Sequence, residues 1–122
     1  MKKIVTKNAP QAIGPYSQAI LANGFIYTSG QLGIPPDTGI LDEDIKDQAN
    51  QAFANIKGIL EEANSSLDKV VKTTVFVTDM AYFPVVNEIY ETYFKERPAR
   101  SFVSVKSLPK NAKIEIEVIA LA

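Results

Sequence analysis

The sequence contains no cysteine and no histidine. Without cysteine the chain has no disulfide bond, no thiolate nucleophile and no cysteine-ligated metal. Without histidine it lacks the side chain that most often serves as a catalytic base and as a metal ligand. Zinc-dependent hydrolysis is therefore not expected, although carboxylate metal sites remain open. Polar chemistry has to come from carboxylates, basic side chains, amides and hydroxyls.

Runs of positive charge and long apolar runs are also missing. The 13 lysines and arginines are scattered and nearly balanced by 14 acidic residues, for a formal net charge of −1. The broad positive field that attracts nucleic acid is therefore not expected. No apolar run approaches the roughly 20 residues that span a bilayer, and no signal-peptide core follows the N-terminus. These absences favour a cytoplasmic protein with no membrane and no nucleic-acid partner.

What is present is typical of one globular domain. The chain has 122 residues, of which 46% are apolar and 22% charged. This is too apolar for a disordered chain and too short for two ordinary domains. No repeat, linker or low-complexity tract interrupts it, so we predict a single domain over residues 1–122.

The N-terminal third predicts strands around a tight turn. Asn23-Gly24 separates the apolar segments 19–21 and 25–27. Asn-Gly between such segments is the strongest short-range signal of a β-hairpin. A short edge strand is expected over residues 3–6.

Two glycine-containing segments near this hairpin have both a structural and a functional interpretation. Tyr16 follows Gly14-Pro15 in a constrained loop. Its ring either packs on the core with a wet hydroxyl or faces a site. Gly30 follows Ser29 at the end of a predicted strand. A glycine there marks a bulge or allows a ligand or another backbone to approach closely.

Two amphipathic helices are predicted. The first spans residues 42–64, and its acidic start is interpreted as a cap rather than a metal site. The second follows Asp79 and accommodates Pro84 only in its first turn. Asn87 and Glu91 share a face of the second helix. The apolar stripes comprise Ile45, Ala49, Ala52, Phe53, Ile56, Ile59, Leu60 and Ala63 in the first helix, and Phe83, Val86, Ile89, Tyr90, Tyr93 and Phe94 in the second.

Three further strands are predicted over residues 69–78, 101–105 and 113–121. The first is rich in Val and Thr, with both faces expected to be largely covered, and is expected to pair in parallel with the strand before the first helix. In the last strand, Glu115 and Glu117 lie opposite an apolar face. Taken alone, this alternation indicates only a sheet with one solvated face.

These elements predict an α+β fold in which two long helices pack on one face of a mixed β-sheet. The other face needs a cover, and self-association would provide it. A symmetric oligomer is therefore expected.

Five motifs, in this order along nearly the whole chain, resemble those of the RidA/YjgF family of reactive intermediate deaminases. They are Gly14-Pro15-Tyr16-Ser17-Gln18-Ala19, Thr28-Ser29-Gly30-Gln31, Lys72-Thr73-Thr74-Val75-Phe76-Val77, Pro98-Ala99-Arg100-Ser101 and Ile114-Glu115-Ile116-Glu117. The resemblance implies a chorismate-mutase-like (bacillus-type) fold and a homotrimer with one site in each intersubunit cleft.

The resemblance also implies the hydrolysis of 2-imino acids, or of enamines such as 2-aminoacrylate, to 2-oxo acids and ammonia. Pyridoxal-phosphate-dependent dehydratases release these intermediates, so the cofactor belongs to the upstream enzyme. The resemblance implies no cofactor and no metal for this chain.

Matching the motifs assigns roles to particular residues. Arg100 is implied to bind the substrate carboxylate and Glu115 to handle the hydrolytic water. Tyr16 is implied to be the loop tyrosine of the site. The implied substrate-binding residues are Arg100, Ser29, Gly30, Asn87 and Phe102. Phe102 is a departure, because relatives often carry cysteine there.

The residue types suit this chemistry. A guanidinium binds a planar carboxylate through two parallel hydrogen bonds, and an imine already carries an electrophilic carbon. Two alternatives remain open. One is a non-catalytic protein that binds small carboxylates or 2-oxo acids and reports their level to a partner. The other is an RNA-cleaving inhibitor of translation.

Overall fold

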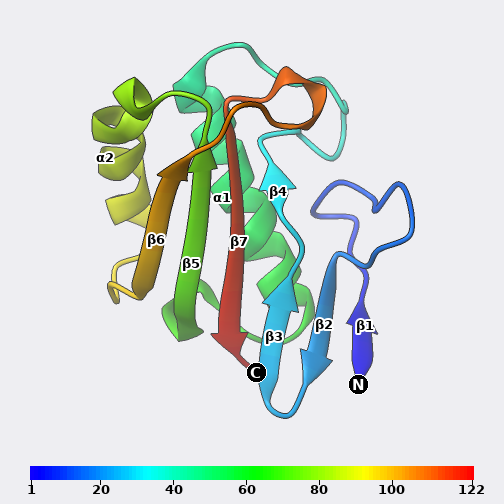
Figure 1. The fold of residues 1–122 in the computed structure, drawn as a ribbon. Coiled ribbons are helices and arrows are strands. Elements are labelled where there is room, and N and C mark those ends of the chain that lie inside the picture. The colour runs from blue at the N-terminus through cyan, green and yellow to red at the C-terminus, as the bar shows by residue number, and fades with distance from the viewer.

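The computed structural model describes residues 1–122 and contains one mixed sheet with two helices (Figure 1). The strand order is β1-β2-β3-β7-β5-β6, and the short strand β4 also pairs with β7. The strands are β1 (Lys2–Ile4), β2 (Ala19–Ala22), β3 (Phe25–Thr28), β4 (Gln31–Leu32), β5 (Val70–Val77), β6 (Ala99–Ser104) and β7 (Ile114–Leu121). The helices are α1 (Ile45–Glu62) and α2 (Phe83–Tyr93).

The predicted hairpin is confirmed. Ala22 of β2 pairs with Phe25 of β3, which leaves a two-residue turn between them. Asn23 and Gly24 both have positive φ, at 52° and 80°. Positive φ at both central positions is what the common two-residue hairpin turn requires.

Helix α1 lies behind the sheet in Figure 1, and its predicted apolar stripe forms the core. The helix is slightly shorter than predicted and begins at Ile45. Asp44 caps it by accepting a 2.7 Å hydrogen bond from the backbone N–H of Lys46. The interpretation of the acidic start as a cap is therefore confirmed.

Helix α2 begins as predicted, with Pro84 in its first turn. A short 3₁₀ turn, Met80–Tyr82, precedes the helix, and the side chain of Asp79 accepts a hydrogen bond from the N–H of Ala81. The helix packs on α1 and beside the β6 edge of the sheet (Figure 1). Neither helix combines the length and apolar character needed to cross a bilayer.

The expected parallel pairing around α1 is wrong. Strands β3 and β5 do not pair, because β7 inserts between them and pairs antiparallel with both. The parallel pair is β5 with β6, joined through α2. At the centre of the sheet β7 buries Ile114, Ile116, Val118 and Ala120, the apolar face of its alternating sequence, in the core.

Only one face of the sheet is covered by the helices, so the expectation of two largely covered faces of β5 is half right. On the covered face Thr73, Val75 and Val77 are fully buried. On the open face, apolar side chains of the neighbouring strands remain substantially exposed to solvent. Among these are Tyr27, Val103 and Leu121, at 44%, 43% and 45% exposed.

Candidate active site

The implied site residues fall into two groups that lie apart in one chain. Glu115 projects from β7 into a cavity of about 1150 Å³ that Tyr16, Ser29 and Gly30 also line. Arg100 instead lines a second cavity of about 620 Å³, with Asn87 and residues at the C-terminal end of α2. We call the first the carboxylate cavity and the second the arginine cavity.

Strand geometry explains this separation. Glu115 and Ile116 point to opposite faces of the sheet, and Ile116 is the one buried under α1. Arg100 lies opposite Thr73 in the β5–β6 register, on the face covered by the helices. The carboxylate and the guanidinium therefore start from opposite faces of one sheet.

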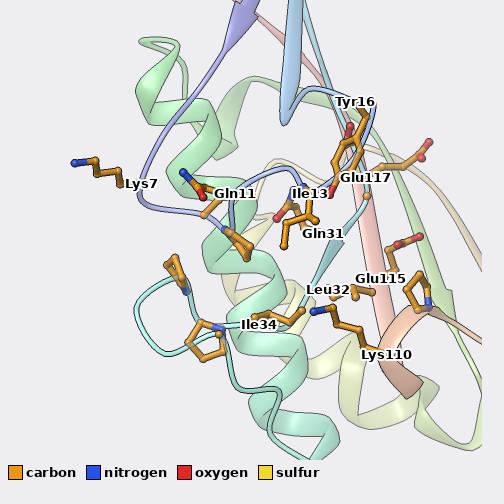
Figure 2. A pocket seen from close by; sticks show the side chains of 18 residues that line it. Lys7, Gln11, Ile13, Tyr16, Gln31, Leu32, Ile34, Lys110, Glu115 and Glu117 are labelled. Carbon is orange, nitrogen blue, oxygen red and sulfur yellow. Dashed lines mark hydrogen bonds between the residues drawn. The ribbon is translucent and has the colours of Figure 1, made fainter.

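The carboxylate cavity opens beside β4, between the loop that follows β1 and the loop that follows β4. Figure 2 shows Glu115 between Tyr16 and Lys110 in this view, with Leu32 close to it. Apolar wall residues such as Ile34 lie farther from the carboxylate. The cavity thus combines a carboxylate, a phenol and an apolar wall.

Gly30 allows Glu115 to occupy this position. The glycine follows Ser29 in the break between β3 and β4, where the pairing with β7 is interrupted. Its backbone lies directly against the Glu115 carboxyl group, and a side chain at residue 30 would displace that carboxyl group. Gly30 thus interrupts the strand, as the structural interpretation expected, and the group that approaches it closely is the Glu115 side chain, not a ligand or another backbone.

Glu115 is a carboxylic acid with altered proton affinity. Partial burial raises the pKa of Glu115, and the nearby negative charge of Glu117 raises this pKa further. Both effects disfavour the ionised form. Such a carboxyl group takes up a proton more readily near neutral pH than an ordinary surface glutamate does, which suits proton transfer to and from water.

Tyr16 does not pack on the core, so the structural interpretation of this residue is wrong. Its side chain is 51% exposed and lines the carboxylate cavity. Its hydroxyl oxygen accepts only a long 3.4 Å hydrogen bond from the N–H of Ile13. The phenol O–H is therefore free to donate to a water molecule or a ligand.

Ser29 has a structural contact as well as a place in the cavity. Its hydroxyl donates a 2.5 Å hydrogen bond to the carbonyl of Ser17, and its N–H donates a 2.9 Å bond to the carbonyl of Gln18. These bonds tie the segment after Tyr16 to the end of β3.

Arg100 is held in a fixed orientation by an amide and by aromatic rings. Its Nη1 donates a 2.7 Å hydrogen bond to Oδ1 of Asn87. Its Cζ lies 4.8 Å from the ring centroid of Tyr90 and 5.6 Å from that of Phe83. Asn87 uses one of the five guanidinium donors, and the planar fork retains donors for a carboxylate.

Phe102, where the resemblance led us to expect cysteine more often, supports Arg100 through its side chain. The Cζ of Arg100 lies 5.4 Å from the Phe102 ring centroid. Phe102 also meets the ring of Phe83 edge to face, at 4.8 Å between centroids. A cysteine here would offer less area to the guanidinium, so the phenylalanine strengthens this aromatic support.

Several cavity residues were not predicted from the sequence. The carboxylate cavity is also lined by Lys7, Gln11, Ile13, Ile34 and Lys110. All of them lie outside the regular helices and strands, where no periodicity marks which side chains converge. Positive φ at Lys110 and Asn111, of 59° and 56°, shapes the turn before β7.

No group of three or more His, Cys, Asp or Glu side chains converges in a way that could hold a metal ion. The polar groups of the site are the carboxylate and the phenol in one cavity, and the guanidinium with its amide partner in the other. Fold and site together define an α+β protein with one mixed sheet, two helices on one face and separate cavities for a carboxylate and a guanidinium.

The chain belongs to the family described as endoribonuclease L-PSP, whose model matches residues 6–122, and this is the RidA/YjgF family. A RutC family protein of Aquifex aeolicus is 50% identical, over 99% of each chain. A 2-iminobutanoate/2-iminopropanoate deaminase of Salmonella typhimurium is 48% identical, over 98% of this chain and 97% of the relative.

Solved structures confirm the fold. The E. coli YjgF gene product has a TM-score of 0.96 at 48% identity, covering 99% of this chain and 98% of its own. E. coli TdcF, solved with bound serine, has a TM-score of 0.96 at 42% identity, covering 100% of this chain and 99% of its own. The predicted α+β architecture is therefore correct.

Proposed function

We propose that this protein is a hydrolytic deaminase that converts reactive 2-imino acids and their enamine tautomers into 2-oxo acids and ammonia. The substrates we propose are 2-aminoacrylate, 2-iminopropanoate and 2-iminobutanoate. The observation that carries the proposal is the Glu115 carboxyl, whose pKa is raised and which lies in one cavity with the Tyr16 hydroxyl. The deaminase relative supports the substrate class.

Arg100 anchors the substrate in this proposal. Its guanidinium binds the 2-imino acid carboxylate through parallel hydrogen bonds, while Asn87 and the aromatic rings fix the orientation of the guanidinium. A rigid anchor fixes the imine carbon relative to the hydrolytic water. Positioning of this kind lowers the entropy cost of the reaction.

Glu115 moves the protons. Its carboxylate takes a proton from water as the water oxygen adds to the protonated imine carbon, which gives a neutral carbinolamine. Glu115 then returns the proton to the nitrogen. The C–N bond breaks with its electron pair on nitrogen, and the hydroxyl proton passes to the ammonia. One water is consumed, and the products are a 2-oxo acid and ammonium. Tyr16 donates a hydrogen bond to the water or to the leaving nitrogen.

A homotrimer would complete the site. One chain keeps Glu115 and Arg100 in separate cavities, so a site with both needs a second copy. The open sheet face, with Tyr27, Val103 and Leu121, offers apolar surface for subunit contact. We therefore propose that the arginine cavity of one subunit faces the carboxylate cavity of the next.

The activity can be tested with an imine generated in place. A pyridoxal-phosphate-dependent dehydratase acting on threonine supplies 2-iminobutanoate, and the release of 2-oxobutanoate is followed with and without the purified protein. We expect faster release with the wild-type protein and none above solvent hydrolysis with Arg100→Ala. Equal rates with and without the wild-type protein would reject the proposal.

A binding protein without catalysis is the second candidate, and serine bound to TdcF favours it. Such a protein would need Arg100 but not Glu115. Calorimetry with 2-oxobutanoate separates the two. A Glu115→Gln variant that binds as wild type and loses turnover supports the enzyme. A wild-type protein that binds but never turns over supports the binder.

RNA cleavage is the third candidate, favoured by the family description as an endoribonuclease. The net charge of −1 and the absence of histidine make it weaker. Ribonuclease activity that co-purifies with the wild-type protein and is lost in Arg100→Ala would support it. Activity that persists unchanged in Arg100→Ala would point to a contaminant.

A further inference from the structure

The side chain of Gln18 is buried just before β2, and its polar atoms bond to the backbone of the segment 6–10. It is 3% exposed. Its Oε1 accepts a 2.7 Å hydrogen bond from the N–H of Thr6, and its Nε2 lies 3.1 Å from the Thr6 carbonyl. The same Nε2 lies 3.3 Å from the carbonyl of Ala9 and 2.8 Å from that of Pro10. One amide thus bonds to backbone groups of Thr6, Ala9 and Pro10.

These bonds close the base of a six-residue flap, residues 11–16. Pro10 marks its beginning and is bonded to the Gln18 side chain. Ser17 marks its end and is bonded through its carbonyl to the Ser29 hydroxyl. The Gln18 carbonyl accepts the N–H of Ser29, so both ends of the flap are fixed around one residue.

The segment 6–10, to which Gln18 bonds, packs on α1. An ideal Cβ atom built on Gly58 would lie 2.6 Å from the Asn8 carbonyl oxygen, so the segment touches the helix backbone. Thr6 and Ala9 are buried at 5% and 2% exposure. Gln18 therefore ties the flap to a fixed base.

The flap has few contacts of its own between these ends. Its internal bonds are a 2.9 Å bond from the N–H of Tyr16 to the carbonyl of Gly14 and the long bond from Ile13 to the Tyr16 hydroxyl. Ile13 is 80% exposed and lines the carboxylate cavity with Tyr16. The location of Tyr16 thus depends on where the flap is anchored.

We propose that Gln18 is a positioning residue that sets Tyr16 in the carboxylate cavity with Glu115 by closing the base of the flap. The proposal rests on the deaminase function proposed above. Gln18 does not line the cavity, so it acts through Tyr16 and not on the substrate. Without its hydrogen bonds the free loop lengthens and the phenol samples more positions. The substrate carboxylate still binds Arg100, so kcat falls while KM changes little.

The test combines amide hydrogen exchange with a double-mutant cycle. Gln18→Leu removes every side-chain hydrogen bond at similar volume, and Gln18→Asn keeps the amide but shortens its reach. We expect faster exchange at Ile13 and Tyr16, a fall in kcat of about tenfold or more, and KM within about twofold of wild type. In a Tyr16→Phe background, the same Gln18 change should cost little further activity, because the two residues act as one unit.

Ile59→Val in α1 is the matched control, since it weakens the core without touching the flap. It should lower Tm and leave flap exchange and kcat unchanged. Additive effects of the Gln18 and Tyr16 changes would overturn the proposal, as would unchanged flap exchange in both Gln18 variants. Gln18→Asn decides the question if Gln18→Leu does not fold. Missing deaminase activity in the wild type would reject the proposed function, whereas hydrogen exchange would still report whether Gln18 holds the flap.

Discussion

An ideal Cβ atom on Gly30 would lie 2.7 Å from the carboxyl carbon of Glu115. Real Cβ atoms essentially never approach another atom that closely, so any side chain at residue 30 displaces the carboxylate. The mechanism needs the carboxylate within hydrogen-bond reach of one water molecule. In the proposed mechanism the glycine is therefore part of the proton-transfer geometry, although it donates no group to it.

Gly30→Ala should lower kcat/KM by about 10²-fold, since a displacement near 1 Å at a reacting group has that effect. The rate of 2-oxobutanoate release measures it. Gly24→Ala is the control. Its φ of 80° makes alanine strained, and nothing lies within 4 Å of the new Cβ. The control should lose about 1 kcal/mol of stability and keep its activity. Full activity in Gly30→Ala would show that the carboxylate location is not critical.

Arg100→Lys should raise KM by roughly 10- to 100-fold, because lysine keeps the charge but loses the planar fork and the stacking on Tyr90. Steady-state kinetics with 2-iminobutanoate measure this effect. Arg97→Ala serves as the control, since Arg97 lines the same cavity but is exposed. Equal losses in both variants would contradict the assignment of Arg100 as the anchor.

Mixing two inactive variants should restore activity if the site spans two subunits. Refolding Arg100→Ala together with Glu115→Gln at equal amounts should regain about a quarter of the wild-type activity, because that fraction of sites combines two intact groups by chance. Each variant refolded alone is the reference. No recovery in a mixture that forms trimers would place both groups of a site on one chain.

Glu117→Gln should shift the acidic limb of the kcat/KM profile to lower pH. The negative charge of Glu117 raises the pKa of Glu115, so removing the charge lowers that pKa and keeps the base ionised at lower pH. Activity at the plateau should change by less than about twofold, because Glu117 is exposed and holds no role in proton transfer. A profile that does not move, or that moves to higher pH, would contradict the coupling.

Glu115→Gln should be slightly more stable than wild type at pH 7. A carboxyl whose folded pKa is raised binds its proton more tightly in the folded state, so stability is greatest at low pH and falls as pH rises through the raised pKa. Glutamine does not ionise and so avoids this loss of stability. The resulting gain in stability is less than about 1 kcal/mol, because solvent screens the partly exposed group. Thermal unfolding at pH 7 and pH 3 tests the sign. The higher stability of Glu115→Gln should vanish at pH 3. A variant that is less stable than wild type at pH 7 would contradict the expected sign.

Local sequence predicted most of the elements because short-range chemistry governs them. Asn23-Gly24 makes the hairpin, Asp44 caps α1 and Pro84 starts α2. The motifs that carry Arg100 and Glu115 indicated the family, and the family is confirmed. The two-residue strand β4 was missed, because a segment that short carries no period and forms only by pairing with β7.

The sequence by itself determined the apolar stripes, the caps, the turn and the residue types available for chemistry, since these depend on neighbours a few residues apart. Only the tertiary structure decided that β7 enters between β3 and β5, that Gly30 lies against Glu115 and that Gln18 closes the flap. It also decided that Arg100 and Glu115 lie in separate cavities of one chain. The physical reason is that each of these depends on pairing between distant segments, and alternation along a strand gives the face of a side chain but not its neighbour across the sheet.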